Sequence, residues 1–271
     1  MKKGVIAVIV VVLAVVVVYK LYYQPQEEPP ATQEVSLPPP QQQEQQTTTI
    51  KHPVYAIPVG EEQREMPAVR QEAIPRLSES DAPLQEALSV FIDPDKLQHS
   101  VVFKNLIRRF VVTVDNLTTA KLPQNYRFLA AVPGTFAVQP GATEDSYTLS
   151  ATNAARYAAF VDLAESVDLN KLLVLYTRYY PLFQQAYEEL GYPHRYFNDR
   201  LVEVISHLLA APEPQGTLQL VQPKVFYDFA DPKLQALSAG QKIMVRVGAD
   251  NERRLKAVLR KLRALLVNKP S

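Results

Sequence analysis

The residues best suited to chemistry in this sequence gather between Tyr176 and Arg200. Tyrosines recur there at three- and four-residue steps, so several share one broad helical face. Together with nearby arginine and amide side chains, they can line a ligand pocket or a surface for a partner protein. The candidate ligand or partner surface consists of Tyr176, Arg178, Tyr180, Tyr187, Tyr192, Asn198, Asp199 and Arg200.

A second set of polar residues interrupts an apolar helical pattern upstream. Arg108 and Asp115 are seven residues apart and share a helical face, so each can meet a partner from another helix. We interpret this set as a structural polar network, with a ligand site as the alternative. Its members are Arg108, Arg109, Asp115 and Asn116.

Acid–base chemistry has weaker support. Asp162 and Glu165 lie one helical turn apart, and paired carboxylates can transfer protons, although such a pair more often forms a solvated helix face. A hydrolase would need a carboxylate to converge with a histidine in a cleft. The carboxylates that could serve are Asp115, Asp199 and Glu203.

Other chemical signatures are missing. The chain has no cysteine, four histidines, eight glycines and no glycine-rich phosphate loop or metalloprotease motif. We therefore expect no catalytic residue, no metal and no cofactor. The formal net charge of +1 argues against a nucleic-acid-binding protein, which usually carries a strong basic excess.

Two helices and a corner must position the candidate surface. Asp168 is a capping residue for a helix over 169–190, Pro181 should kink it, and Gly191 suits its left-handed C-terminal position. Asn198 then caps a helix over 199–210. A ligand pocket would lie at the Pro181 kink and the 191–193 corner.

The remaining pattern predicts a mainly α fold with a few short strands or extended segments. A stripe of apolar residues predicts one helix over about 94–117, and Asp231 begins a short helix that Ala239 and Gly240 close. Further helices and strands come from periodicity, capping residues and alternation. The helices are 81–91, 151–168 and about 250–267, and the strands are 135–138, 147–149 and an extended piece over 218–229.

The N-terminus predicts a membrane anchor. Residues 4–23 are apolar apart from Lys20 and are long enough to cross a bilayer as a helix. Lys2 and Lys3 place the N-terminus in the cytoplasm and the rest of the chain in the periplasm. A cleaved signal peptide and a buried core helix are the alternatives, but no small-residue cleavage site follows the run.

The stretch 24–75 predicts a disordered spacer rich in proline, glutamine and glutamate, because large apolar residues are sparse. A short apolar patch over 54–59 could dock elsewhere. The expected organisation is an N-terminus and transmembrane anchor at 1–23, the spacer at 24–75, a helical globular domain at 76–268 and a tail at 269–271.

The last predicted helix carries a basic ridge opposite its apolar face. On a membrane-anchored domain this ridge could contact anionic lipid, and the alternative is a solvated face on the closing helix. The ridge consists of Arg253, Arg254, Lys256, Arg260, Lys261 and Arg263.

Four ungapped strings carry a family resemblance: RRFVVTVDNL, YTRYYPLFQQAYEELGYP, YFNDRLVEVISHLL and LSAGQKIMVRVGADN. Over roughly Arg76 to Leu266 the chain resembles the bacterial Domain of Unknown Function 3014 family. The resemblance implies a membrane segment, a proline-rich spacer and this domain, and it brings no activity. Ser206 departs from the aspartate that many such proteins carry there, which argues against a carboxylate role.

These observations favour a single-pass inner-membrane protein with a periplasmic domain. The spacer lets the domain search for a partner, so we expect a non-enzymatic interaction or scaffold module of the cell envelope with an envelope protein as partner. The alternative is a binding module for a small envelope ligand near 176–200, and a hydrolase is the third hypothesis.

Overall fold

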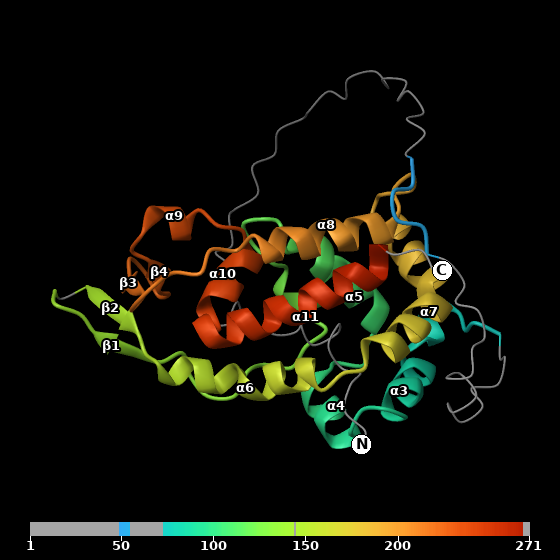
Figure 1. Cartoon of the computed structure of the whole chain (residues 1–271), viewed down its shortest axis with the longest axis horizontal. Helices are drawn as coiled ribbons and strands as arrows, with labels where there is room; N and C mark the ends of the chain where they lie inside the picture. Colours follow the sequence, from blue (N-terminus) through green and yellow to red (C-terminus); the bar gives the residue numbers. More distant parts are fainter. Residues whose placement is uncertain (1–48, 55–72, 144, 268–271) are drawn as a thin grey trace, which may run out of the picture.

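The computed structural model describes residues 49–54, 73–143 and 145–267, and it is mainly helical with one small sheet (Figure 1). This confirms the predicted fold class for the domain. The helices are η2 (Leu77–Glu79), α3 (Asp81–Ser89), α4 (Pro94–Ser100), α5 (Leu106–Asn116), η3 (Gln124–Tyr126), α6 (Thr152–Glu165), α7 (Leu169–Glu189), α8 (Phe197–Leu209), α9 (Pro232–Gln235), α10 (Ala239–Arg246) and α11 (Ala249–Val267). The strands are β1 (Val138–Pro140), β2 (Ser146–Leu149), β3 (Gln219–Val221) and β4 (Asp228–Phe229).

Helices α5, α7, α8 and α11 form the main core. Helix α11 packs against α6, α7 and α8, while α5 packs against α7 and α8. Figure 1 shows α11 lying between α6 and α8. Phe110 meets Phe183 edge-on at 5.5 Å between ring centres, and Phe183 stacks on Phe197 at 6.0 Å. These three rings therefore join α5, α7 and α8 through buried apolar area, which is the main stabilising contribution in such a core.

The sheet lies at the other end of the domain from α7 (Figure 1). Its order is β1-β2-β3-β4, and every neighbouring pair is antiparallel. Tyr147 of β2 pairs with Leu220 of β3, so the sheet joins segments on either side of α6, α7 and α8. Leu220, Phe229 and Val245 form a separate small apolar cluster beneath it.

The prediction of one helix over 94–117 is wrong. Helix α4 ends at Ser100, Val101 forms an isolated bridge with Leu129, and α5 begins only at Leu106. Asn105 has a left-handed φ of 55°, which asparagine tolerates better than most residues. The Asp81 carboxylate then accepts hydrogen bonds from the backbone N–H groups of Asn105 and Leu106 at 2.6 and 2.8 Å. A side chain from α3 therefore caps α5, which local periodicity could not reveal.

Gly240 has a different place from the one expected. It lies in the first turn of α10, which Ser238 caps, and does not close the preceding short helix. A Cβ at Gly240 would come within 2.7 Å of the Leu117 carbonyl oxygen. Glycine is needed here because α10 approaches the end of α5 closely.

Helix α11 confirms the predicted final helix but buries charge in the core. Glu252 is fully buried and Lys256 is 3% exposed. The Lys256 ammonium lies 3.0 Å from Glu252 Oε1 and donates hydrogen bonds to the Ala211 carbonyl and to Glu213 Oε1. Glu252 Oε2 has no hydrogen-bond partner within the described residues. Burial raises the pKa of the Glu252 carboxyl, and the nearby Lys256 opposes that shift.

The predicted membrane anchor at 4–23 lies outside the described residues. Within the described part of the chain, no helix is both long and apolar enough to span a bilayer.

The buried Glu252 carboxyl predicts a pH dependence of stability. Because its pKa is raised in the folded state, its favourable contribution is complete below the ordinary value of 4.5 and is lost as the pH rises through the folded-state pKa. We expect Glu252→Gln to remove this loss. The unfolding free energy of the wild type, relative to the variant, should therefore fall between acidic and neutral pH in chemical denaturation. The exposed Glu79→Gln variant controls for loss of a carboxylate, and equal pH slopes for wild type and Glu252→Gln would contradict the assignment.

Candidate functional site

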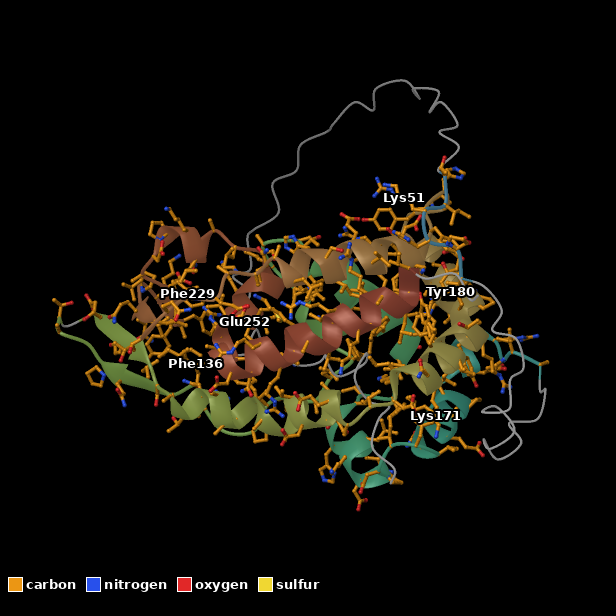
Figure 2. The ribbon with its side chains drawn as sticks, viewed as in Figure 1. Lys51, Phe136, Lys171, Tyr180, Phe229 and Glu252 are labelled. Carbon is orange, nitrogen blue, oxygen red and sulfur yellow. The ribbon has the colours of Figure 1, made fainter. Side chains whose placement is uncertain are left out.

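Residues 49–54, which we call the strap, lie against the corner where α7 leads into α8. Figure 2 labels Lys51 of the strap and Tyr180 of α7 at the same end of the molecule. The strap falls inside the predicted spacer. The apolar patch predicted docking only from Val54 onward. Val54 does pack against the main core, but the polar contacts begin at Lys51.

The hydrogen bonds that hold the strap all use its backbone. The Asp199 carboxylate accepts from two successive N–H groups, those of Lys51 at 3.0 Å and His52 at 2.6 Å. The Asn198 amide donates to the His52 carbonyl at 2.8 Å, and the Tyr196 hydroxyl accepts from the Val54 N–H at 2.9 Å. We call Tyr196, Asn198 and Asp199 the corner site. Asp199 lies in the first turn of α8, where the helix dipole favours a negative charge.

Asn198 is held in place by groups from other elements. It is 1% exposed, its side-chain oxygen accepts from the Tyr176 hydroxyl at 3.2 Å, and its backbone N–H donates to the Tyr180 hydroxyl at 3.3 Å. Its amide also lies 3.4 Å from the Leu266 carbonyl at the end of α11. The predicted capping role is wrong, because α8 begins at Phe197 and Asn198 already lies within it. The side chain serves distant partners instead.

The two tyrosines beneath Asn198 act as neutral hydrogen-bonding groups. Burial raises the pKa of Tyr176 well above its ordinary value of 10.0, and burial is also the largest cause of the raised pKa of Tyr180. The Tyr180 hydroxyl donates to Gln184 Oε1 at 3.0 Å, and the same oxygen accepts from the Phe197 N–H at 2.9 Å. The corner site is therefore preorganised by α7.

The other tyrosines and Arg200 form a second group around Asp115. Arg200 Nε donates to Asp115 Oδ1 at 2.8 Å, and the Tyr192 hydroxyl donates to Asp115 Oδ2 at 3.2 Å. Arg200 also contacts Glu203 at 3.0 Å. Tyr187 is 1% exposed and stacks on Tyr192, and burial raises its pKa to about 12. This second group, which we call the Asp115 cluster, joins α5 to α8.

The remaining predicted polar residues lie apart from the corner site. Arg108 pairs with Glu189 of α7, and Arg109 donates to the backbone carbonyls of residues 104, 125 and 127. Asn116 bonds the Val112 carbonyl in its own helix. The Arg178 guanidinium lies 5.7 Å from the centre of the Tyr179 ring. As expected, Arg108 and Asp115 each meet a partner on another helix.

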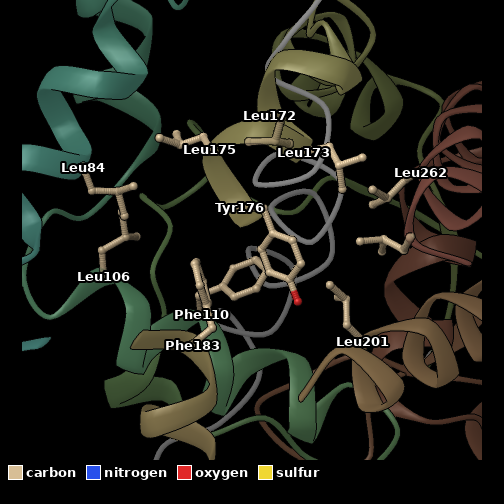
Figure 3. A pocket seen from close by; sticks show the side chains of 11 residues that line it. Leu84, Leu106, Phe110, Leu172, Leu173, Leu175, Tyr176, Phe183, Leu201 and Leu262 are labelled. Carbon is tan, nitrogen blue, oxygen red and sulfur yellow. The ribbon is translucent and has the colours of Figure 1, made fainter. Parts of the chain in front are cut away.

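A small apolar cavity lies behind Tyr176, between α3, α5, α7, α8 and α11 (Figure 3). Its volume is about 40 Å³. Cavities that bind a molecule as small as benzene measure roughly 150 Å³ on a comparable scale. Its lining includes Tyr176 but neither Arg178 nor Arg200, so it differs from the pocket expected at the Pro181 kink. We interpret it as a packing void in the core.

The carboxylates proposed for acid–base chemistry are occupied by other contacts. Asp199 binds the strap, Asp115 and Glu203 both bind Arg200, and no histidine side chain in the described residues hydrogen-bonds to any of the three. His207 Nε2 instead lies 2.7 Å from Ser238 Oγ, and burial lowers its pKa. No cluster of potential metal ligands occurs among the described residues. The geometry therefore gives no support to the hydrolase hypothesis.

The acidic pair on α6 and the basic ridge on α11 meet in part. Arg254 of α11 bonds both Asp162 and Glu165, with a 2.7 Å contact to Glu165 Oε2, so this pair binds a cation. Lys256 is buried rather than part of the ridge. The exposed cations of the ridge are Arg253, Arg260, Lys261 and Arg263.

Comparison with known families gives one match. Residues 106–263 match the family described as "Protein of unknown function (DUF3014)". The chain belongs to this family. The match runs from α5 to α11 and so includes the corner site and the Asp115 cluster, but not the strap. No curated protein and no solved structure matches the chain significantly.

Of the corner site, the sequence indicated Asn198 and Asp199 but not Tyr196, whose hydroxyl binds the strap. It also did not indicate Gln184, which lies outside the corner site and ties α7 to the start of α8. Gln184 and Tyr196 lie in strings that carry the family resemblance, which is the signal that could have drawn attention to them.

Two carboxylate–arginine pairs on α5 should differ in their contribution to stability. Asp115 and Arg200 are 13% and 15% exposed, so Asp115→Ala should lower the unfolding free energy by about 2 kcal/mol, because it leaves a half-buried guanidinium without its main partner. Glu189 and Arg108 are 37% and 41% exposed, so Glu189→Ala should change it by less than about 1 kcal/mol. Urea unfolding of both variants measures the difference. Equal losses would show that the Asp115 cluster does not fix α5 to α8.

Proposed function

We propose that this DUF3014 protein is a membrane-anchored interaction module of the cell envelope, without enzymatic activity. In this proposal residues 4–23 cross the inner membrane, and the domain works in the periplasm on a tether. The apolar run, which carries no charge over residues 4–19, and the lysines before it support the anchor and its orientation. The partner is an envelope protein.

One observation carries the interaction role: the corner site binds a separate stretch of polypeptide through that stretch's backbone. The Asp199 carboxylate accepts hydrogen bonds from two successive N–H groups of the strap. The buried Asn198 amide donates a hydrogen bond to the carbonyl of His52, the residue before Pro53. Groups arranged in this way recognise peptide. By contrast, the carboxylates of the described domain that could act in catalysis are used to hold arginines or the strap.

The exposed cations of α11 add a second contact in the same proposal. Arg260 and Arg263 lie on the exposed side of the last helix, close in sequence to Leu266 beneath the corner site. Such cations can attract anionic headgroups and hold the domain near the bilayer when the tether allows it.

The topology can be tested with single cysteines, because the chain has none of its own. Lys233 is exposed, so a Lys233→Cys variant should react in cells with a membrane-impermeant maleimide once the outer membrane is permeabilised. The matched variant carries a single cysteine inserted after Met1, which keeps Lys2 and Lys3, and it should stay unlabelled until the inner membrane is lysed. Labelling of both cysteines, or of the N-terminal one alone, would contradict the proposed orientation.

The interaction role can be tested by photo-crosslinking in intact cells. A photoreactive residue at exposed Arg195, beside the corner site, should give a defined adduct with an envelope protein. The same residue at Lys233, at the α9 end of the domain, should not give that adduct. If the two positions give the same adducts, or neither gives one, the proposed interaction surface is wrong.

A further inference from the structure

We propose that the corner site is a peptide clip, that the strap is its intramolecular ligand, and that an extended segment of a partner protein displaces the strap. This inference rests on the proposed function and names the recognition chemistry of the site. The occupant to which we commit is a partner segment, not the strap of a second copy.

The clip forms hydrogen bonds to the backbone of the strap and makes few contacts with its side chains. Its hydrogen bonds reach the N–H of Lys51, the N–H and carbonyl of His52 and the N–H of Val54. Thr49, Ile50 and Lys51 point their side chains toward solvent, and Ile50 is 49% exposed. A different peptide that presents the same backbone groups can therefore make the same hydrogen bonds.

The contacts define which peptide fits. We number the peptide from the residue that takes the place of Lys51. Its first and second residues, equivalent to Lys51 and His52, must not be proline, because both N–H groups bind Asp199. Proline is accepted at the third position, where the strap has Pro53 and the clip needs no donor. The fourth residue supplies an N–H to Tyr196 and an apolar side chain that packs against the core, as Val54 does. The partner segment is thus extended, tolerates proline at the third position and has an apolar residue at the fourth.

The clip survives without its ligand because its groups keep other partners. Asn198 retains the Tyr176 hydroxyl and the Leu266 carbonyl when the His52 carbonyl leaves. Asp199 is half-buried while the strap is bound, and it becomes accessible to water when the strap leaves. The strap can therefore leave without leaving a buried polar group unpaired, which is what exchange requires.

Exchange also changes the reach of the domain. While the strap is bound, the chain between the predicted anchor and the clip is 24–48, which spans at most roughly 85 Å. When a partner takes the clip, the tether extends over 24–72, which spans at most roughly 165 Å. Binding of a partner is thus coupled to release of tether length.

The test uses the full chain in detergent and a capped fluorescent peptide with the sequence TIKHPVY, residues 49–55. Lys51→Pro with His52→Pro removes both N–H donors from the strap and leaves the clip intact. We expect this double variant to bind the peptide at least tenfold more tightly than the wild type in fluorescence anisotropy. Adding Asp199→Asn, which removes one of the two acceptor oxygens, should abolish the gain.

Peptide variants test backbone recognition directly. A peptide with alanine in place of Lys51 should bind the double variant equally well, and one with proline in place of His52 should not bind. Loss of binding with the alanine peptide, or equal binding by wild type and double variant, would overturn the clip.

Displacement is measured with a Val54→Cys variant, because Val54 is half-buried and the chain has no other cysteine. Saturating peptide should speed maleimide labelling at least fivefold, and an unchanged rate would overturn displacement.

Light scattering identifies strap exchange between copies: a wild-type dimer that the double variant lacks would overturn the choice of occupant. A confirmed clip without a crosslink in cells would refute the proposed function alone, whereas a crosslink without peptide binding would refute only the clip.

Discussion

The arrangement of the domain depends on one buried amide. Asn198 is 1% exposed, and its polar atoms join α7 through two tyrosine hydroxyls, the last turn of α11 through the Leu266 carbonyl, and the strap through the His52 carbonyl. A buried amide left without partners would cost on the order of 1–3 kcal/mol for each unpaired group. Helices α7 and α11 are therefore constrained to meet at Asn198, and this places Asp199, the next residue in the chain, beside the strap.

The constraint works because the layers around it are apolar and rigid. Phe110, Phe183 and Phe197 pack against one another directly below the start of α8, and the Asp115 cluster fixes the same helix to α5. Dense packing leaves side chains little freedom to change rotamer. The corner site thus combines a packed apolar base with a half-buried carboxylate, which is an arrangement suited to binding another segment of chain.

Local signals in the sequence predicted the elements whose stabilisation is local. Asp168 accepts hydrogen bonds from residues 170 and 171 as a cap, Gly191 follows α7 with a φ of 112°, and α11 has its expected extent.

The predictions that failed concern residues whose partners are distant in the sequence. Asn198 resembles a cap, but its side-chain partners in the strap and α11 are 146 and 68 residues away. The spacing of Lys256 fits a basic ridge, but its side chain is buried and paired with Glu213 and Glu252. Apart from Val54, the strap left no pattern, because recognition of backbone selects few side chains.

The covalent link between strap and clip sets the strength that a partner needs. A segment that belongs to the same chain as its site is presented at an effective concentration that can reach the order of millimolar. A free peptide of identical contacts would therefore compete poorly, whatever its intrinsic affinity. The few contacts of the strap limit this advantage over a free peptide. The strap uses four backbone hydrogen bonds and one half-buried valine, and the side chains of residues 49–51 are exposed to solvent. A partner that adds side-chain contacts at those positions gains affinity that the strap does not have. Such a partner can displace the strap, whereas a ligand without these contacts cannot compete with it.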